Sequence, residues 1–324
     1  MPRILITAAF DESLLARQTP QNSGRWSEFE FLFEPDGEPV DAWVVYDDLR
    51  QPVTQWCQPG NTLLITGEPP SLRQYRTRYT SQFAQIWTSH TSIAHPHVTL
   101  RNEGQHWHYG IWNAAAHGHA LGFDELQALR RPAKPKVLSV LCSAKAVTAD
   151  HRRRLDFVRY LQSELGDQID VFGSGIRPVA DKSEAIWPYK YHCVLENDHS
   201  DYFMTEKLPD AFLGWSYPIY FGGKEAYHRF PEGSFSAIDI YQPEQALNVI
   251  RNVLASDTYG NSIERISEAR NNVLMKHNLF AMLVDYWRSN LVRQPASLVT
   301  LLPKSHRTGL VVQQIKRTLT GRAA

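Results

Sequence analysis

The chain has 324 residues, of which 43% are hydrophobic and 21% charged, and its 34 basic residues balance its 34 acidic residues. This composition predicts a sizeable core, and the length predicts about two domains. It excludes general disorder and a transmembrane helix, because no apolar run approaches ~20 residues, and the charge balance argues against a dedicated nucleic-acid binder.

In the first half, short apolar or β-branched runs between turn residues predict strands at 4–7, 42–46, 62–66 and 85–88. A helix is predicted over residues 71–83. The run that begins at Ile4 meets Asp11 and Glu12 at once, so it predicts a first strand and not a secretory signal.

A domain boundary is predicted at residues 130–136, where two prolines stand among basic residues. Residues 1–132 contain no lysine and have ten arginines against 14 acidic residues, whereas the remainder has 24 basic residues against 20 acidic ones. The net charge therefore changes sign at this point. We therefore predict a first domain at 1–132, a second at 137–300 and a basic tail at 301–324.

Strand and helix patterns alternate more clearly in the second half. The predicted strands lie at 137–141, 169–172, 191–195, 218–221 and 234–240, and the predicted helices at 148–165, 205–213, 243–254 and 263–291. Thr148 or Asp150 would cap the first of these helices. Such alternation predicts an α/β fold with parallel sheets and right-handed crossovers, and two such domains in succession predict a cleft between them.

The cysteines indicate no special site. Cys57, Cys142 and Cys193 are odd in number and widely spaced, which fits neither a disulfide framework nor a zinc site.

Polar residues follow the predicted strand that ends at Leu195. Glu196 and Asn197 come directly after it, and ligands in open α/β sheets bind beyond such strand ends. Thr205 then predicts a helix N-cap, followed by Glu206 and Lys207. A lysine in the first turn is unfavourable for the helix dipole, and an anion bound at this helix start would explain it.

A series of short motifs surrounds these residues. In order they are Tyr189-Lys190-Tyr191, Glu196-Asn197, Thr205-Glu206-Lys207, Ala211-Phe212, Pro218-Ile219-Tyr220, Gly222 and Pro231-Glu232-Gly233-Ser234-Phe235. Their order and spacing resemble the donor-binding signature of glycosyltransferase family 10, the α-1,3/4-fucosyltransferases, in its bacterial form. The resemblance covers residues 137–254 well and the first half only loosely.

The resemblance implies a GT-B-type fold, in which two Rossmann-like domains face a cleft. The second domain would hold a nucleotide sugar, typically GDP-fucose or another GDP-sugar, and the first a glycan acceptor. Fucose would pass with inversion to a hydroxyl of a glycan of lipopolysaccharide or capsule type, with no obligatory cofactor and no metal. Two alternatives stay open, namely a different nucleotide-sugar donor on the same fold and a non-catalytic scaffold that binds glycan or nucleotide.

An inverting transfer needs a base for the acceptor hydroxyl, and we expect Glu68 to supply it. Glu68 follows a predicted strand, and Pro69 favours an extended backbone before it, which fixes where the carboxylate points. The string Thr66-Gly67-Glu68 also resembles the base motif of the family. The alternative interpretation is a carboxylate on a surface loop.

The resemblance also assigns roles on the donor side. Arg154 and Lys207 would contact the diphosphate, Glu206 would support positive charge on the sugar, and Asn197 would orient the donor or its loop. The remaining donor-binding residues that match family positions are Lys190, Glu196 and Thr205. A basic helix start at Arg154 and a surface capping turn at 205–207 are the structural alternatives.

This chain departs from the family pattern at three places. Tyr202-Phe203 stands where the family has Asp-Tyr, so we expect Tyr202 to replace the missing hydroxyl. Asp198 stands in place of a serine and adds a negative charge near the diphosphate. Gly173-Ser174-Gly175 replaces a turn that is rich in arginine or lysine.

Two further signals concern partners and location. His106-Trp107-His108 and His117-Gly118-His119 predict packing or acceptor contact, because no matched carboxylates or cysteines suggest a metal. Beyond residue 290 there are six basic residues and no acidic one, with apolar residues at helical spacing. Such a tail predicts either peripheral contact with an anionic membrane or a helix docked on the protein. Family members in eukaryotes usually carry an N-terminal membrane anchor, and this sequence shows no apolar run of that length. We therefore expect a bacterial, cytoplasmic protein, which would be peripheral on the inner membrane if the tail binds there.

Overall fold

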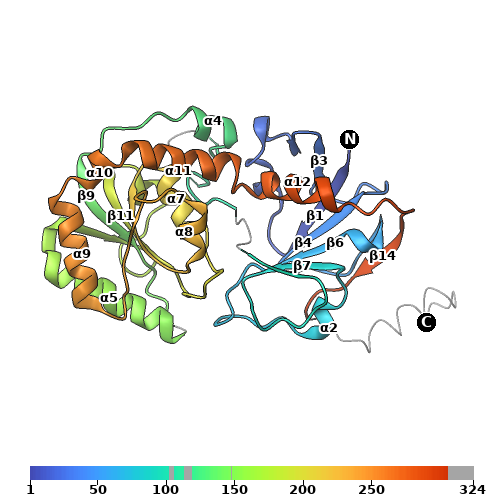
Figure 1. The fold of residues 1–324 in the computed structure, drawn as a ribbon, viewed down its shortest axis with the longest axis horizontal. Helices are drawn as coiled ribbons and strands as arrows, with labels where there is room; N and C mark the ends of the chain where they lie inside the picture. Colours follow the sequence, from blue (N-terminus) through green and yellow to red (C-terminus); the bar gives the residue numbers. More distant parts are fainter. Residues whose placement is uncertain (102–105, 113–118, 147, 306–324) are drawn as a thin grey trace.

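A computed structural model describes residues 1–101, 106–112, 119–146 and 148–305 (Figure 1). They form two α/β units, each built on a sheet of mainly parallel strands. The predicted fold class, two Rossmann-like units with a cleft between them, is confirmed. None of the helices in these described ranges is both long and apolar enough to span a membrane.

The first unit contains a seven-stranded sheet in the order β2-β3-β1-β4-β6-β7-β8. Its strands are β1 (Arg3–Ala8), β2 (Arg25–Trp26), β3 (Phe29–Leu32), β4 (Ala42–Tyr46), β6 (Thr62–Ile65), β7 (Gln85–Thr88) and β8 (Val98–Leu100). All neighbours pair in parallel except β2 and β3. The short helices α1 (Ser13–Ala16) and α2 (Thr77–Thr80) and the 3₁₀ turns Pro20–Asn22 and Pro59–Asn61 connect them.

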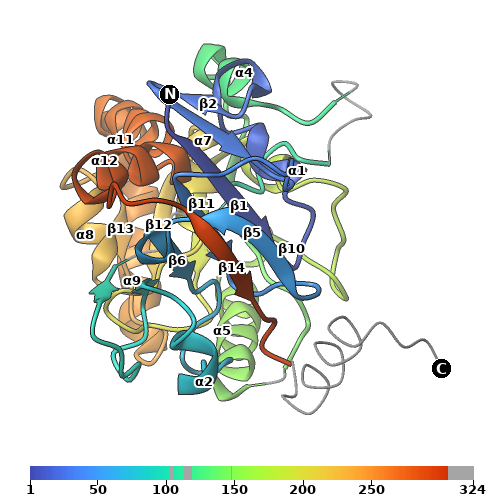
Figure 2. The ribbon, with the colours of Figure 1, turned by 90° about the vertical axis from the view of Figure 1, so that its right-hand side faces the viewer.

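Both faces of this sheet are covered, because successive residues of a strand point to opposite sides. On β1, Ile4 and Ile6 pack in a core with helix α12 (Leu279–Asn290), whereas Leu5 packs in a separate core with Tyr79. A second, two-stranded sheet joins β5 (Val53–Cys57) to β14 (Ser297–Leu301) in antiparallel register (Figure 2).

The second unit contains a five-stranded parallel sheet in the order β10-β9-β11-β12-β13. Its strands are β9 (Lys136–Leu141), β10 (Ile169–Phe172), β11 (Tyr189–Leu195), β12 (Tyr217–Phe221) and β13 (Ser236–Ala237). Its helices are α4 (Phe123–Ala128), α5 (Ala149–Leu165), α6 (Ser183–Ile186), α7 (Lys207–Leu213), α8 (Glu225–Arg229), α9 (Pro243–Ala255), α10 (Thr258–Asn261) and α11 (Ile263–Met275), and a 3₁₀ turn spans Gly166–Gln168.

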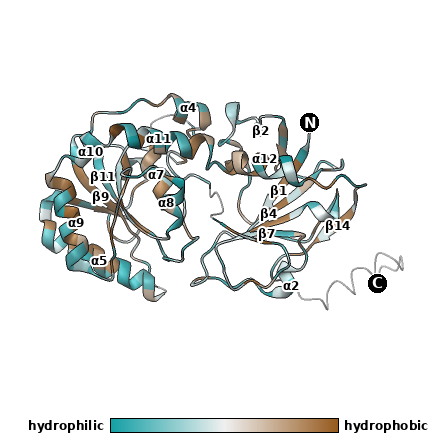
Figure 3. Ribbon diagram, viewed as in Figure 1, coloured by the Kyte–Doolittle hydropathy of each residue, from teal (hydrophilic) through white to brown (hydrophobic). Residues whose placement is uncertain are grey.

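Helices α5 and α9 pack together on one side of this sheet, and α7 and α11 pack together on the other (Figure 1). The strands in the centre are largely hydrophobic, while the outer helices carry hydrophilic residues (Figure 3). This pattern fits strands buried on both faces. Gly173, after β10, has φ +140°, and a Cβ there would lie 2.0 Å from the carbonyl oxygen of Cys142, so the Gly173-Ser174-Gly175 turn needs glycine at its first position.

The structure draws the domain limits differently from the prediction at 1–132, 137–300 and 301–324. Trp107, Tyr109 and Phe123 belong to the core of the second unit, although they precede the predicted boundary. Conversely, α12 and β14 return to the first unit, where Phe280 and Leu283 pack under β1 and β4. Composition marks the basic linker, but tertiary packing decides which core each apolar segment joins. Residues 306–324 of the predicted tail lie outside the described residues.

Several elements differ from their predicted extents. Of the helix predicted over 71–83 only α2 forms, because Leu72 N and Arg73 N both donate to the carbonyl of Pro69 in a turn. The strand predicted at 234–240 is reduced to β13 at the sheet edge. The helix predicted over 263–291 is broken at 276–278, where the Asn278 side chain caps α12. Strands β2, β3, β5, β8 and β14 were not predicted.

Candidate active site

A cavity of about 590 Å³ lies between the two units, at the carboxyl ends of β9 and β11. The loop after β6 contributes Glu68 and Leu72 from the first unit, and the second unit provides the other walls. The predicted residues that line it are Glu68, Arg154, Asn197, Glu206 and Lys207. The structure therefore brings the predicted base to the predicted donor-binding residues.

Glu196 is 1% exposed and organises the turn that leads into α7. Its carboxylate accepts hydrogen bonds from Thr205 N at 2.7 Å and from Thr205 Oγ1 at 2.7 and 2.9 Å. Lys207 Nζ lies 3.2 Å from Glu196 Oε2 and 2.8 Å from Thr205 Oγ1. Thr205 Oγ1 also accepts from Lys207 N at 3.3 Å, as expected of a capping residue. Glu196 and Thr205 thus act beneath the cavity by positioning Lys207.

Arg154 projects from α5 and reaches the strand end across the cavity floor. One guanidinium nitrogen donates to Asn197 Oδ1, and the same nitrogen lies 3.5 Å from the carbonyl oxygen of Leu195. Arg154 is 5% exposed. Within the described part of the chain no carboxylate lies within ion-pair distance of its guanidinium. Thr148 caps α5 as predicted, because its Oγ1 accepts a hydrogen bond from His151 N at 3.1 Å.

A buried lysine that the sequence analysis missed lies beside Glu206. Lys182 Nζ is 2.6 Å from Glu206 Oε1 and 2.9 Å from Asp210 Oδ2. Burial alone would raise the pKa of Glu206, but the positive charges of Lys182 and Lys207 hold that pKa well below its usual range. Burial would likewise lower the pKa of Lys182, and the two carboxylates outweigh this and raise it. Glu206 is therefore a buried, ionised carboxylate.

His106 and His108 pack over this cluster from the first half of the chain. Their Nε2 atoms lie 2.9 Å apart, and His108 Nδ1 is 3.4 Å from Glu206 Oε1. Burial lowers the pKa of His106 to about 4 and that of His108 to about 3. Asp210 accepts hydrogen bonds from the backbone N–H groups of His108 and Tyr109. This motif packs as predicted, whereas His117 and Gly118 lie outside the described residues.

Glu68 is half-buried on the loop that enters the cavity. Its backbone is held on both sides, because Glu68 N donates to Tyr75 Oη at 3.4 Å and its carbonyl contacts His90 Nε2 at 2.7 Å. Burial raises the pKa of the Glu68 carboxyl, which nearby Arg73 opposes. A carboxylate with a raised pKa is a stronger base than an ordinary glutamate.

Besides Glu196 and Thr205, which lie beneath the cavity, two further predicted donor-binding residues do not line it. Lys190 stands at the amino end of β11, five residues before Leu195 and so about 16 Å along the strand from the end where ligands bind. Tyr202 is half-buried in the turn before α7 and also lies outside the cavity wall. Lys190 matches the family in residue type, but its position at the amino end of β11 places it far from the cavity.

Asp198 does not point its charge at the cavity. Its carboxylate accepts hydrogen bonds from Ser200 N at 2.7 Å and from Ser71 of the first unit. Burial would raise its pKa, but these hydrogen bonds lower it. Asp198, which was expected near the diphosphate, therefore connects the two units instead.

No group of three or more histidine, cysteine, aspartate or glutamate side chains in the described ranges is arranged to hold a metal ion. The three cysteines are all buried and free.

Comparison with known proteins gives one sequence match and several structural ones. Residues 132–264 match the family described as glycosyltransferase family 10 (fucosyltransferase), C-terminal. No curated protein matches the chain in sequence. The matched segment includes the whole five-stranded sheet of the second unit together with Arg154, Asn197, Glu206 and Lys207.

The solved structures described next resemble the chain but are distant from it in sequence. An α1,3-fucosyltransferase with GDP is 16% identical, covering 86% of this chain and 93% of that chain with a TM-score of 0.49. A further structure of an α1,3-fucosyltransferase is 16% identical, covering 100% of this chain and 91% of that chain with a TM-score of 0.48. MnaA of S. aureus with UDP is 9% identical, covering 92% and 99% with a TM-score of 0.41.

The assignment therefore comes from the sequence match, which spans the unit that supplies most of the cavity. Residues 132–264 match glycosyltransferase family 10 (fucosyltransferase), and this match identifies the chain as a glycosyltransferase.

Proposed function

We propose that this protein is an inverting fucosyltransferase that moves fucose from GDP-fucose to a hydroxyl of a glycan, of lipopolysaccharide or capsule type. The observation that carries the proposal is Arg154, a buried cation in the cavity wall with no carboxylate partner among the described residues. A buried charge is costly unless it is paired, so its counter-charge would come from the ligand.

A diphosphate suits this position. A guanidinium presents a planar fork of N–H donors that matches phosphate oxygens, and Asn197 holds the Arg154 fork at the strand end. Lys207 lies in the same cavity wall and adds a second positive charge. These two cations would stabilise the negative charge that develops on the leaving GDP.

Glu206 would face the sugar. Its carboxylate stays ionised because Lys182 and Lys207 hold its pKa low, so it offers a negative charge to an anomeric carbon that becomes positive in the transition state. Glu68 would take the proton from the acceptor hydroxyl. The acceptor oxygen then bonds to the anomeric carbon from the face opposite GDP, the bond from that carbon to the phosphate oxygen breaks, and GDP leaves with the electron pair.

Nucleotide binding is the first test. We would measure thermal shifts with GDP, UDP, CMP, dTDP and ADP, since a ligand at ~100 times its Kd adds about 2.7 kcal/mol to stability. We expect GDP alone to stabilise the protein, Arg154→Met to lose that shift, and Arg159→Met, an exposed arginine on the same helix, to retain it. Selective stabilisation by another nucleotide would discard fucose as the donor sugar.

Catalysis is tested separately from binding. Without acceptor, the enzyme should slowly hydrolyse GDP-fucose to GDP and fucose, with water taking the place of the acceptor hydroxyl. Glu206→Ala should abolish this hydrolysis. A protein that binds GDP but never hydrolyses or transfers fucose would be a scaffold and not an enzyme.

We also propose that the enzyme works in the cytoplasm and that its basic tail touches the inner membrane. The support is the sequence of residues 301–324, most of which lie outside the described residues. Pelleting with anionic liposomes should capture the full chain more strongly than a chain that ends at Ser305. Equal binding of the two would remove the tail from membrane contact.

A further inference from the structure

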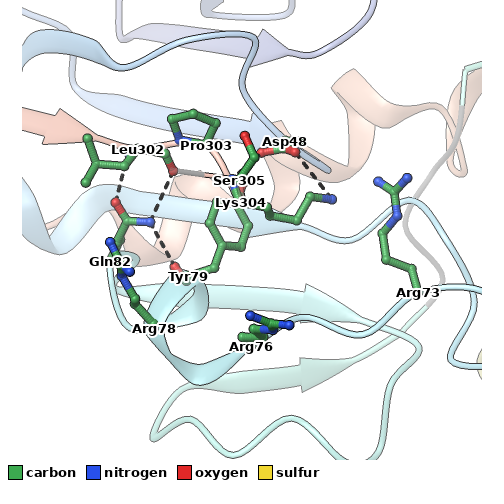
Figure 4. A pocket seen from close by; sticks show the side chains of 10 residues that line it. All are labelled: Asp48, Arg73, Arg76, Arg78, Tyr79, Gln82, Leu302, Pro303, Lys304 and Ser305. Atoms are coloured by element: carbon green, nitrogen blue, oxygen red, sulfur yellow. Dashed lines mark hydrogen bonds and ion pairs between the residues drawn. The ribbon is translucent and has the colours of Figure 1, made fainter. Parts of the chain in front are cut away.

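A second cavity, of about 700 Å³, lies on the first unit beside the loop that carries Glu68 (Figure 4). Leu72 of this loop lines the cavity between the units, and the next residue, Arg73, lines the second cavity. Two consecutive residues of this loop therefore line two different cavities, which makes the cavities neighbours. We call the second one the basic cavity, after the residues Arg73, Arg76, Arg78 and Lys304 in its wall.

The far wall of the basic cavity is the chain that follows β14. Gln82 fixes it, because its amide donates to the Leu302 carbonyl at 3.2 Å and accepts from Leu302 N at 2.9 Å (Figure 4). Lys304 N donates to Asp48 Oδ1 at 2.9 Å. Pairing of β14 with β5 holds the preceding residues in register. The wall is thus docked onto the first unit by specific bonds.

The positive charge of the basic cavity is only partly neutralised. Lys304 Nζ lies 3.0 Å from Asp47 Oδ2, and Arg73 lies 2.5 Å from the same carboxylate. Arg76 and Arg78 are exposed, and neither makes an ion pair with any residue in the described ranges. Two guanidinium groups therefore remain free at one concave surface, where an oxyanion would accept paired hydrogen bonds from them.

The rest of the wall combines the polar residues Asp48, Gln82 and Ser305 with Tyr79, Leu302 and Pro303. The ring of Tyr79 is buried, and Lys304 Nζ lies 5.9 Å from its centroid. Leu302 and Pro303 flank it (Figure 4). Ligand pockets commonly combine such an apolar lining with a few charged groups that fix orientation. The wall of the basic cavity therefore offers both charged and apolar groups to a ligand.

We propose that the basic cavity binds an anionic group of the acceptor, a carboxylate or a phosphate ester on a sugar close to the one that receives the transfer. This inference rests on the proposed function, because it takes the glycan as the substrate at Glu68. It specifies the acceptor as an acidic glycan. Arg76 and Arg78 would bind the charge, while the accepting hydroxyl of the neighbouring sugar would reach Glu68 around the Leu72–Arg73 step.

The same contacts connect the basic cavity to the proposed base. Asp47, which binds Arg73 and Lys304, also accepts a hydrogen bond from Tyr75 Oη. Tyr75 Oη in turn accepts from Gly67 N and Glu68 N. An acceptor bound to Arg76 and Arg78 in the basic cavity would therefore lie beside the loop whose backbone positions Glu68.

The test uses the full chain with saturating GDP, so that the first cavity is occupied. Immobilised oligosaccharides are offered in three matched forms that differ in one sugar, which is a neutral hexose, a hexuronate or a hexose 6-phosphate. We expect the wild type to bind the charged forms at least about tenfold more tightly than the neutral form, a preference that weakens with salt. Preference for the hexuronate or for the phosphate ester identifies the source of the charge.

The decisive variant is Arg76→Ser with Arg78→Ser. It should lose the preference for charged forms while its GDP-induced thermal shift stays that of the wild type. The matched control is Arg25→Ser with Arg159→Ser, which removes the same charge from exposed positions whose ion pairs contribute little. The control should keep the preference.

Absence of any preference for the charged forms, including absence of all binding, would overturn the proposal, as would equal loss in the variant and its control. Binding to phosphatidylglycerol vesicles that depends on Arg76 and Arg78, without a preference among the oligosaccharides, would assign the basic cavity to a membrane surface and also overturn it. If GDP gives no thermal shift but the charged glycans still bind through these arginines, the proposed function fails and the anion site stands.

Discussion

Single residues in the cavity between the units differ in whether the fold supplies their counter-charge. Lys182 contacts both Glu206 and Asp210, and Lys207 contacts Glu196, so these cations are paired within the protein. Arg154 is buried without such a carboxylate among the described residues. Paired charges shape the site, and we expect the unpaired one to bind a negative charge of the ligand.

Replacing Glu68 with glutamine tests the base. Glu68→Gln keeps the size of the side chain but removes its ability to accept a proton, so we expect kcat to fall by about 10²–10⁴. The GDP-induced thermal shift should be unchanged, because the role proposed for Glu68 is toward the acceptor and not toward GDP. Turnover close to that of the wild type would remove Glu68 from the mechanism.

The pH profile gives a second measure of the same residue. Burial raises the pKa of Glu68, so its basic form is lost at a higher pH than for an ordinary glutamate. As pH falls, kcat/KM should decline with an apparent pKa above the usual glutamate range, and it should be flat above that point until another group titrates. The residual activity of Glu68→Gln should not show this decline.

Lys182 is expected to matter for folding more than for ligand contact. Lys182→Met would leave Glu206 and Asp210 buried without their shared cation, so we expect the free energy of unfolding to fall by about 3–5 kcal/mol. Urea unfolding followed by circular dichroism measures the loss. Lys224→Met, which breaks an exposed ion pair with Asp201, is the control and should change stability by less than about 1 kcal/mol.

At the scale of elements, a cap divides what the sequence shows as one continuous helical pattern. Asn278 Oδ1 accepts a hydrogen bond from Phe280 N at 3.0 Å and so begins α12. Its Nδ2 donates to the carbonyl of Gln18 at 2.7 Å, which ties the start of α12 to the first unit. Asparagine is favoured at such positions because its side chain satisfies a helix N–H group that has no partner in the helix.

Asn278→Ala should therefore lower the free energy of unfolding by at least about 1 kcal/mol, the usual contribution of an N-cap. Asn290→Ala is a matched control, because Asn290 is an exposed asparagine at the opposite end of the same helix. Chemical denaturation of both variants measures the difference. Equal effects would mean that the cap does not stabilise α12.

Much of the element pattern and part of the site could be predicted from the sequence. Short β-branched runs identify the central strands, and the segment 189–223 identifies Asn197, Glu206 and Lys207, because these signals are local. Lys182 could not be found in this way, because its carboxylate partners lie 24 and 28 residues away. Strand β14 could not be predicted for the same reason, since Thr300 and its partner Thr54 are 246 residues apart.

At the scale of the whole molecule, the first unit depends on residues from the far end of the chain. Phe280 is fully buried and packs edge-on against Phe31, with their ring centroids 4.8 Å apart. Helix α12 covers one face of the first sheet, and β14 extends the cover of the other. The first 132 residues therefore do not contain the complete core of the first unit.

Phe280→Ala should cost about 3–5 kcal/mol through lost burial and the cavity left behind. Hydrogen exchange followed by mass spectrometry should show protection lost in β1 and β4 while β9 and β11 keep theirs. Leu298→Ala, at a side chain that is 58% exposed, should leave both sheets protected. Equal loss of protection in the two sheets would show that the units unfold together.

Gln18, a fully buried residue, lies where the chain passes between the two units. Its side chain accepts a hydrogen bond from Trp107 N at 2.8 Å, near the outward passage, and its carbonyl accepts from Asn278 Nδ2, at the return. The second unit is thus an insertion in the first, and the two chain connections that lead into and out of it lie side by side. Because both connections pass the same place, we expect any rotation of the second unit against the first to be centred near Gln18.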